Sequence, residues 1–153
     1  MTVSSRFAVA SHLLSLLSTH PGEVMSSEHL ACSVGVNPVI VRGVSGMLRR
    51  AGLVCSRQGV AGLSLARSAE TITLLDVYRA VQPPERLIAL HEHPSQSCSV
   101  GRHIQSALGE VCNEAQAALE ARLARSSLAD LADDLRRRAG EPERAAPTRL
   151  QPV

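Results

Sequence analysis

The chain has 153 residues, enough for one domain with an appendage, and 44% of them are hydrophobic, so it can build a packed core. It contains one Phe, one Tyr and no Trp, which disfavours a binder of single-stranded nucleic acid, because such proteins depend on aromatic stacking platforms. The net charge of +2 is unevenly distributed along the chain. Residues 1–68 hold six arginines against two glutamates (+4), and residues 69–153 hold ten arginines against twelve acids (−2). The first half is therefore the part expected to contact phosphate.

Signals for export or for a membrane are missing from the sequence. No apolar run approaches the roughly 18 residues of a membrane span, and the N-terminus lacks the pattern of a signal peptide. The four cysteines, at positions 32, 55, 98 and 112, are far apart and form no CxxC pair. We therefore expect free thiols in a cytoplasmic protein without a membrane partner.

Two helices are predicted before the most basic segment. Residues 4–18 place apolar side chains on one face at helical spacing, and the sequence His20-Pro21-Gly22 ends this helix. His12 lies inside it, where we expect a partly buried packing residue rather than a metal ligand. The next helix opens at residues 26–28, and Cys32 within it is expected to be a small core residue.

The helix predicted to begin at Pro38 has the clearest start signal in the chain. Asn37 is a good N-cap, and Pro38 suits the first helical position, where its missing N–H costs nothing. Spacing places one set of side chains on the inward face: Val41, Val44, Ser45 and Leu48. The outward face carries Val39, Arg42, Gly43, Gly46, Arg49 and Arg50.

The two glycines of this outward face are open to two interpretations. Each costs roughly 1 kcal/mol relative to alanine inside a helix. They are either neutral drift or a kink, or they remove side-chain bulk where the helix meets another surface closely. Small residues surrounded by guanidiniums favour the second interpretation, with a phosphate-lined groove as that surface.

A β-hairpin is predicted after this helix. Gly52 ends the helix in the left-handed conformation, and residues 53–57 and 63–67 alternate apolar and polar side chains around a loop that contains glycine. With the two preceding helices the hairpin completes a winged helix-turn-helix, a module that lays one helix in the DNA major groove. At the tip Arg57 and Gln58 could enter the minor groove, although Arg57 taken alone is better explained as a solvated turn charge.

We therefore expect double-stranded DNA as a partner. The candidate DNA-binding residues are Ser27, Asn37, Pro38, Val39, Arg42, Gly43, Arg49, Arg50, Arg57 and Gln58. The DNA-binding domain would span residues 1–82, because residues 72–81 form one more amphipathic helix, opened by a capping box between Thr73 and Asp76.

Residues 83–99 form a polar linker that could carry a sensor. Four potential metal ligands fall within 13 residues, three in this linker and one just after it: His91, His93, Cys98 and His103. Their spacing is not that of a standard zinc module, and the two histidines of an HxH loop are often solvated. No cofactor is therefore expected, and a metal ion at His91, His93 and Cys98 is the alternative. Cys98 just precedes a helix N-terminus, whose dipole lowers the pKa of a thiol, so it is the candidate redox sensor.

The second half of the chain predicts a homodimer. Residues 100–125 form a helix about 38 Å long, at 1.5 Å per residue, with apolar side chains recurring at helical spacing. A module of about 80 residues cannot bury such a stripe alone, so we expect two copies to cross in a symmetric dimer that reads a palindromic operator. The expected contacts are Ile104, Leu108, Val111, Ala115 and Leu119.

A short helix and a tail complete the predicted organisation. Ser127 caps the helix with Asp130 at the capping-box position, and the dipole alone explains its three consecutive arginines at 136–138. The dimerisation segment spans residues 100–138, and the tail of residues 139–153, which contains prolines, is expected to be disordered. The fold class is thus mainly α with a small β-hairpin wing: a winged helix-turn-helix followed by a long dimerisation helix.

Several segments together resemble the Rrf-two family of bacterial winged-helix transcription regulators. They are VNPVIVRGVSGMLRRAGLV, RQGVAGLSLAR, ITLLDVYRAV and HPSQSCSVGRHIQSAL, and the resemblance covers about residues 1–135. It implies a dimeric DNA-binding regulator, usually a repressor. Many members of the family sense iron–sulfur status, nitric oxide or redox state through three cysteines in the loop before the long helix.

This chain departs from the family pattern in that loop. Of the three cysteines only Cys98 is present, in the position of the last. The chain therefore resembles the branch that lacks the cluster and responds to a small molecule, a partner protein or thiol oxidation. A few members bind a cluster through a histidine of the first helix, where His12 lies, but Ala8 and Val34 occupy the regions of the other ligands.

Three hypotheses of function follow. The first is a dimeric, sequence-specific DNA-binding regulator, expected to be a repressor that responds to a redox signal, a small molecule or a partner protein. The second is a protein-interaction module built on a winged helix. The third is a metal-, iron–sulfur- or thiol-dependent sensor that also binds DNA and uses Cys98 with nearby histidines. An enzyme is not expected, because no paired carboxylates, phosphate-binding glycine loop or nucleophile–base signature stands out.

Overall fold

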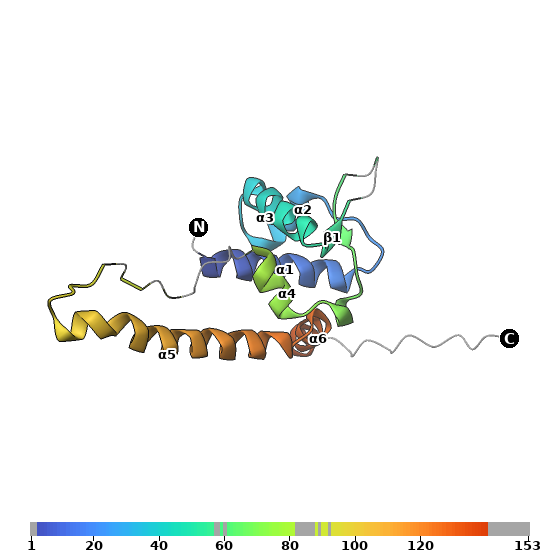
Figure 1. Ribbon diagram of the computed structural model, residues 1–153. Helices are drawn as coiled ribbons and strands as arrows, with labels where there is room; N and C mark the ends of the chain where they lie inside the picture. The colour runs from blue at the N-terminus through green and yellow to red at the C-terminus, as the bar shows by residue number, and fades with distance from the viewer. Residues whose placement is uncertain are drawn as a thin grey trace.

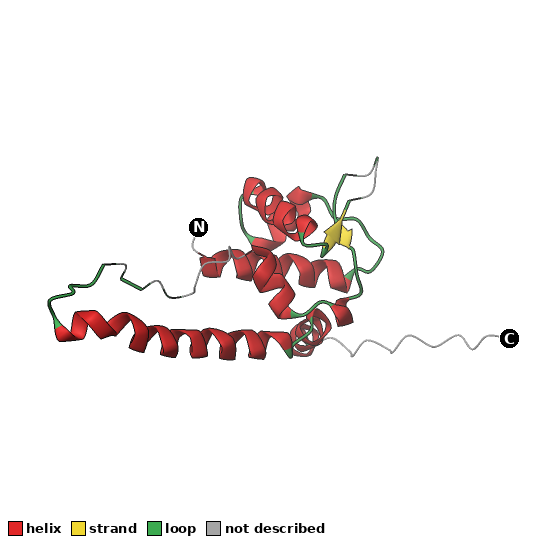
Figure 2. Ribbon diagram, in the orientation of Figure 1, coloured by secondary structure: helices red, strands yellow, loops and turns green. Residues whose placement is uncertain are grey.

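The computed structural model describes residues 3–56, 59, 61–81, 88, 90–91 and 93–140. Its elements, in chain order, are α1 (Val3–Thr19), α2 (Ser27–Val34), α3 (Pro38–Arg50), β1 (Val54–Cys55), β2 (Ser64–Leu65), a 3₁₀ turn η1 (Ala69–Thr71), α4 (Leu74–Val81), α5 (Ser99–Ala124) and α6 (Leu128–Ala139). Helices α1 to α4 form a compact group, and α5 extends beside it as a long rod that ends at α6 (Figure 1). The small sheet, β1 paired with β2, lies beside α1 and α3 (Figure 2).

One core joins the N-terminal helices, the base of the wing and the last helix. Helix α1 packs against α3, α4 and α6. The largest fully buried side chains of this core are Leu13, Leu14, Leu30, Leu48, Leu53, Ile72 and Leu128. Helix α3 buries Val41, Val44, Ser45 and Leu48. The face predicted to be inward is therefore confirmed.

Helices α2 and α3 form the predicted helix-turn-helix. Asn37 Oδ1 accepts a hydrogen bond from the Val39 amide at 2.8 Å, so the predicted N-cap is confirmed. Ser26 Oγ caps α2 by accepting from the His29 amide at 3.2 Å, and α2 ends at Gly35 with φ of 72°. Among the described residues no single helix is long and apolar enough to cross a membrane; α2 and α3 pass that test only as a pair bent by 108°.

The two strands of the wing are shorter than predicted. Val54 pairs with Leu65 and Cys55 with Ser64, so each strand has two residues. The residues just before each strand form backbone hydrogen bonds outside the sheet. Leu53 donates its amide to Leu48 O at the end of α3, and Leu63 exchanges two hydrogen bonds, of 2.9 and 3.0 Å, with Met25.

A glycine is required where the wing meets the chain between α1 and α2. Gly62 has φ of 140°, and a Cβ at this position would lie 2.6 Å from the carbonyl oxygen of Met25. This close approach anchors the base of the wing to the helix-turn-helix. The tip residues Arg57 and Gln58 lie outside the described part of the chain, so their predicted place stays a prediction.

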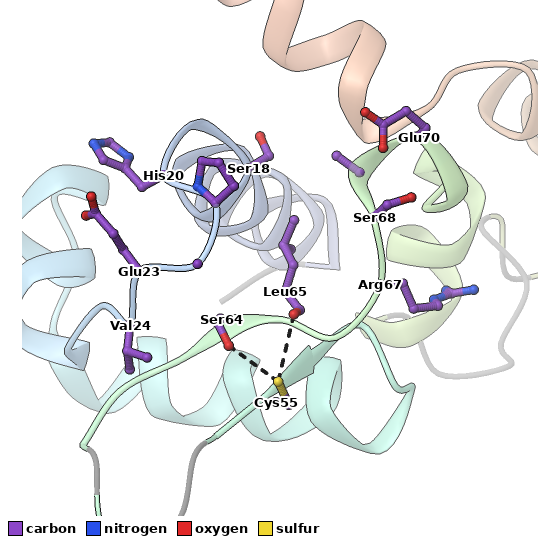
Figure 3. A pocket seen from close by; sticks show the side chains of 13 residues that line it. Ser18, His20, Glu23, Val24, Cys55, Ser64, Leu65, Arg67, Ser68 and Glu70 are labelled. Atoms are coloured by element: carbon purple, nitrogen blue, oxygen red, sulfur yellow. Dashed lines mark hydrogen bonds between the residues drawn. The ribbon is translucent and has the colours of Figure 1, made fainter. Parts of the chain in front are cut away.

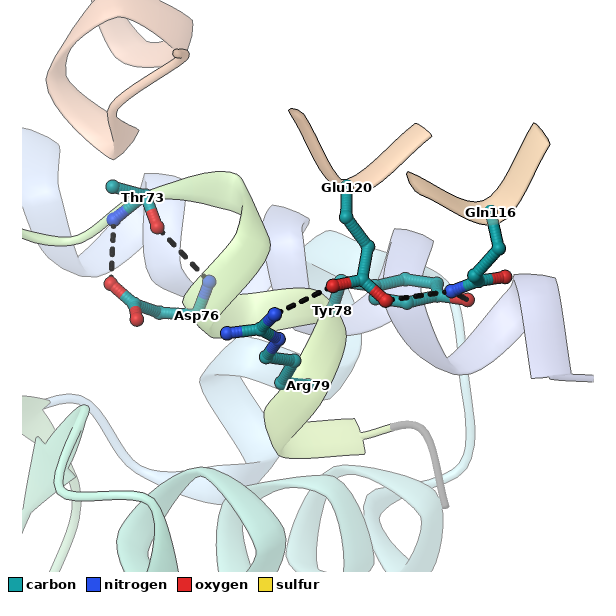
Figure 4. A network of polar contacts seen from close by, with 6 residues as sticks. All are labelled: Thr73, Asp76, Tyr78, Arg79, Gln116 and Glu120. Carbon is teal, nitrogen blue, oxygen red and sulfur yellow. Dashed lines mark hydrogen bonds and ion pairs between the residues drawn. The ribbon is translucent and has the colours of Figure 1, made fainter. Parts of the chain in front are cut away.

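Polar contacts attach α5 to α4. The predicted capping box at the start of α4 is confirmed: Thr73 N donates to Asp76 Oδ2 at 3.0 Å, and Asp76 N donates to Thr73 Oγ1 at 3.1 Å. One turn later Arg79 pairs with Glu120 of α5 at 2.6 Å. Gln116 also donates to Glu120 and lies beside Tyr78 (Figure 4). Gln116 and Arg79 together lower the pKa of the Glu120 carboxyl.

Helix α6 begins as its sequence predicts and continues to Ala139, the first residue of the predicted tail. Ser127 and Asp130 form a complete capping box, which lowers the pKa of the Asp130 carboxyl. Ion pairs along α6 join its three consecutive arginines to acids of the preceding turn: Arg136 to Asp133, and Arg137 and Arg138 to Asp134. These pairs account for the arginine run without nucleic acid. Residues 141–153 of the tail lie outside the described part of the chain, so their predicted disorder stays a prediction.

Two predictions of burial are wrong. His12 was expected to be partly buried, yet it is exposed, because the buried face of α1 runs through Val9, Ala10 and Leu13 and leaves His12 on the other side. Cys32 was expected in the core but is exposed, because α2 turns only Leu30 and Ala31 fully inward. Cys112 of α5, by contrast, is buried.

Candidate nucleic-acid interface

Most of the outward face of α3 is exposed to solvent. Val39 is 64% exposed, and Arg42, Gly43, Arg49 and Arg50 are exposed with it. A Cβ added at Gly43 would meet no atom within 4 Å. Nothing inside the described protein therefore requires a glycine at position 43, which favours the interpretation that another molecule approaches there.

A hollow of about 430 Å³ lies between α3 and the base of the wing. Its lining, called here the α3–wing hollow, consists of Ser27, Arg42, Ser45, Arg49, Ser56, Ala61, Gly62 and Leu63. It brings together three predicted DNA-binding residues that come from two helices: Ser27, Arg42 and Arg49. The remaining candidates of α3 lie on the neighbouring exposed surface, with Asn37 exposed and Pro38 half-buried.

Sequence reasoning missed Ser45 and Ser56 as members of this surface. The spacing of α3 placed Ser45 on the inward face, and it is indeed buried. A serine among the apolar residues of an inward face is, however, a signal in itself, because a buried hydroxyl needs a partner. Ser56 follows the strand β1, and its place depends on how the wing folds back over α3.

The charge of this surface is predominantly positive. Arg42 lies 3.8 Å from Glu28, but both side chains are more than half exposed, and such pairs contribute about 0–1 kcal/mol. Arg49 and Arg50 form no ion pair with any other described residue. The arginines are therefore available to an external anion.

A second hollow, of about 470 Å³, lies between the α1–α2 turn and the outer side of the wing (Figure 3). It is lined by both signs of charge, with Arg67 opposed by Glu23 and Glu70. The Cys55 thiol at its base lies 3.4 Å from the Ser64 hydroxyl. This mixed lining has no preference for phosphate, in contrast to the α3–wing hollow.

The candidate metal ligands do not form a site. His12, His91, His93 and Cys98 are all exposed. Within the described part of the chain, no group of three or more His, Cys, Asp or Glu side chains could hold a metal ion. Iron–sulfur clusters are normally held by four ligands, so the donors present do not fit such a cluster.

Cys98 lies at the start of the long helix, as predicted. It is the N-cap residue of α5 and is exposed. The backbone amides of Gly101 and then Val100 lower the pKa of its thiol, by attraction of the thiolate, although its sulfur makes no capping hydrogen bond. The geometry therefore gives Cys98 the properties of a reactive thiol, and its role as a sensor stays a prediction.

A row of exposed apolar side chains runs along α5. Val100 is 66% exposed, Ile104 41%, Leu108 44% and Val111 61%, and Ala115 is exposed as well. Leu119, the last of the predicted contacts, is half-buried. A stripe of this kind on a single protomer is typical of a surface that another chain covers.

The fold and its basic surface define a winged helix-turn-helix protein that regulates transcription by binding DNA. The family model described as "Iron-dependent Transcriptional regulator" matches residues 3–134. The chain belongs to this family, Rrf2, as its sequence motifs predicted.

Known relatives agree with this assignment. A protein of Bacillus subtilis (strain 168), YwnA, named as a proposed HTH-type transcriptional regulator, is 47% identical over 133 residues, which are 87% of this chain and 98% of YwnA. A crystal structure of a proposed DNA-binding protein has 44% identity and a TM-score of 0.70, covering 82% of this chain and 97% of the other. A proposed transcriptional regulator from Lactobacillus plantarum has 25% identity and a TM-score of 0.74, covering 85% and 89%. The protein is thus a DNA-binding transcriptional regulator and not an enzyme.

Proposed function

We propose that this regulator acts as a homodimeric repressor that places α3 of each protomer in the major groove of a palindromic operator. The observation that carries the proposal is the outward face of α3, where arginines without strong partners surround a glycine that the fold does not need. Val39, Arg42 and Gly43 would meet bases. Ser27, Asn37, Pro38, Arg49 and Arg50 would meet the sugar–phosphate backbone, and the wing residues Arg57 and Gln58 the minor groove.

The exposed stripe of α5 supports the dimer. Val100, Ile104, Leu108 and Val111 recur at intervals of three and four residues, which puts them on one face of the helix. A second copy of the same stripe would bury this face in an isologous contact. The two α3 helices would then lie about 34 Å apart, one turn of DNA, so each would read one half of a palindrome.

The signal is proposed to be a redox change at Cys98, a small molecule or a partner protein. The lowered pKa and the exposure of the Cys98 thiol support the first of these. The family description names iron, but the donor groups of the described residues do not support a bound cluster in this chain. We place no step of the mechanism on a metal.

The test is selection of duplexes from a random library with the purified protein, followed by affinity measurements. We expect an inverted repeat to be enriched. The substitution Arg42→Ala should weaken binding to it by about 1–3 kcal/mol and relax the preference at one base pair, if Arg42 contacts guanine with two hydrogen bonds. Arg125→Ala is the matched control, because this exposed arginine at the end of α5 lies outside the proposed surface.

Two outcomes would contradict the proposal. Equal affinity of the wild type and Arg42→Ala for the selected duplex would remove α3 from the base contacts. Failure to enrich any sequence, together with partner binding that does not depend on salt, would instead identify a protein-interaction module, because contacts to phosphate give a steep salt dependence.

A further inference from the structure

Backbone hydrogen bonds attach the C-terminal end of the long helix α5 to the winged helix-turn-helix. Leu74 N, at the start of α4, donates to Ser126 O at 2.8 Å. Leu128 N, at the start of α6, donates to Ile72 O at 2.7 Å. Both bonds lie at the turn between α5 and α6, beyond the last residue of α5. By themselves they form a pivot about which the rest of α5 could swing.

A second attachment, made by side chains, fixes the angle between α5 and α4. Arg79 of α4 lies 2.6 Å from Glu120 Oε2, and Gln116 donates to Glu120 Oε1 at 2.9 Å, so both carboxylate oxygens of Glu120 are occupied (Figure 4). Tyr78, next to Arg79, is only 7% exposed, and its ring packs edge-on against Phe7 of α1. The ion pair, called here the Arg79–Glu120 clip, therefore joins α5 to a part of α4 that is fixed in the core.

The length of α5 makes this clip important for the geometry of the proposed dimer. At 1.5 Å per residue, Glu120 lies about 9 Å along the chain from the pivot at Ser126, and the exposed side chain of Ile104 about 33 Å from it. A displacement of about 1 Å at Glu120 thus becomes about 4 Å at Ile104, by proportion of these lengths. Since ion pairs between partly exposed side chains add little to stability, the main effect of the clip is on the angle of α5.

We infer that the Arg79–Glu120 clip sets the distance and orientation between the two α3 helices of the dimer, and so determines which spacing of half-sites the protein binds. The inference rests on the proposed function, a dimer on a palindromic operator, and specifies what fixes its geometry. Arg79 and Glu120 are positioning residues, because they lie outside both the outward face of α3 and the exposed apolar stripe of α5. Each protomer has one clip, so a substitution acts twice in the dimer.

The test measures affinity for duplexes in which one or two base pairs are added or removed between the half-sites of the selected inverted repeat. We expect the wild type to prefer one spacing. Arg79→Gln should bind this spacing about tenfold more weakly, because each of the two clips contributes up to a few-fold, and should lose most of the preference over the other spacings. A duplex with a single half-site should bind both proteins equally, since α3 is unchanged.

A matched control separates the position of the clip from the loss of an ion pair. Arg138 Nε lies 2.7 Å from Asp134, and these side chains are 76% and 38% exposed, against 64% and 29% for Arg79 and Glu120. Arg138 and Asp134 both belong to α6, so their pair joins no two helices. Arg138→Gln should therefore keep the affinity and the spacing preference of the wild type. Circular dichroism checks that both variants fold.

Reversal of the pair tests whether the contact itself is the cause. The double variant Arg79→Glu with Glu120→Arg restores opposite charges on α4 and α5, and it should recover the spacing preference that Arg79→Gln loses. Failure to recover the preference would contradict the inference. Weaker binding of Arg79→Gln to the single half-site would also contradict it, because Arg79 would then contact DNA directly.

The remaining outcomes distinguish this inference from the proposed function. If the wild type prefers one spacing and Arg79→Gln keeps the same preference, the clip does not set the geometry and the proposed function stands. If Arg138→Gln loses the preference to the same extent, the effect is a general one of stability, and the inference is again wrong. A wild type that binds all spacings equally, or that binds as a single protomer, would overturn the proposed palindrome-reading dimer itself.

Discussion

Gly43 offers a substitution whose effects on stability and on DNA binding should have opposite signs. It lies inside α3, and a Cβ added there would meet nothing within 4 Å. Gly43→Ala should therefore gain the full helix-propensity difference, about 0.8–1.0 kcal/mol of unfolding free energy. For a chain of this size that corresponds to a rise in Tm of roughly 2–4 °C.

The same methyl group projects from the surface proposed to lie against DNA. If the groove approaches α3 closely at Gly43, the added carbon must displace the helix, and operator affinity should fall while the Tm rises. Thermal unfolding by circular dichroism and fluorescence anisotropy with the selected duplex measure the two quantities.

Asn113→Ala on α5 is the control for Gly43→Ala, because it also improves propensity at an exposed helical position, far from α3 in the sequence. It should raise the Tm without changing affinity. A Gly43→Ala protein that is more stable and binds the operator as tightly as the wild type would refute the close approach. A lower Tm would refute the open space around Gly43.

Two further predictions concern α5. Leu108 is 44% exposed in the protomer, so Leu108→Arg should leave the far-ultraviolet circular dichroism unchanged. The substitution should halve the mass measured by light scattering, because it places a charge in the proposed dimer interface. An unchanged dimer mass would place the interface elsewhere. Cys98 should react with iodoacetamide fastest of the four cysteines near neutral pH, since its lowered pKa leaves more of the thiol as thiolate than in the unfolded chain. The pH of half-maximal rate for Cys98 should accordingly rise on unfolding in urea, and faster labelling of Cys55 or Cys112 would contradict the prediction.

Start signals of helices were the most predictable feature of the chain. Asn37 before Pro38, and the capping boxes that begin at Thr73 and Ser127, each form within three residues, so the sequence contains all the groups that take part. The inward face of α3 followed from spacing for the same reason. Predictions made from neighbouring residues fail only where a segment distant in the sequence takes up the same backbone groups or covers the same face.

The wing shows such competition. Alternation predicted five-residue strands, but alternation does not record that Met25, nearly forty residues earlier, takes both hydrogen bonds of Leu63. Nor does it record that Leu53 completes the end of α3 instead of starting a strand. The exposure of His12 and Cys32 was missed for a related reason: which flank of a helix is covered depends on where the neighbouring helices lie.

The same competition explains why the hollow was not foreseen. The spacing of α3 predicts that Arg42 and Arg49 point outward and Ser45 inward, because a helix considered alone has only two sides. In the fold the wing returns to α3 through the contact of Gly62 with Met25, and this contact places Ala61 and Leu63 beside the boundary between the two faces. Residues assigned to opposite sides of the helix thereby line one hollow.

Two features of this chain reduce the stability of a single protomer in water, and together they indicate its surfaces of interaction. Gly43 weakens a helix that an alanine would strengthen, and the α5 stripe exposes side chains such as Val111. Gly43 lies on the exposed face of α3, where arginines supply positive charge, and this face favours an anionic partner. The α5 stripe is apolar and favours a partner of the same kind, a second α5. The protomer is therefore expected to reach its full stability only as a dimer on DNA, since ligands that bind only the folded state stabilise it.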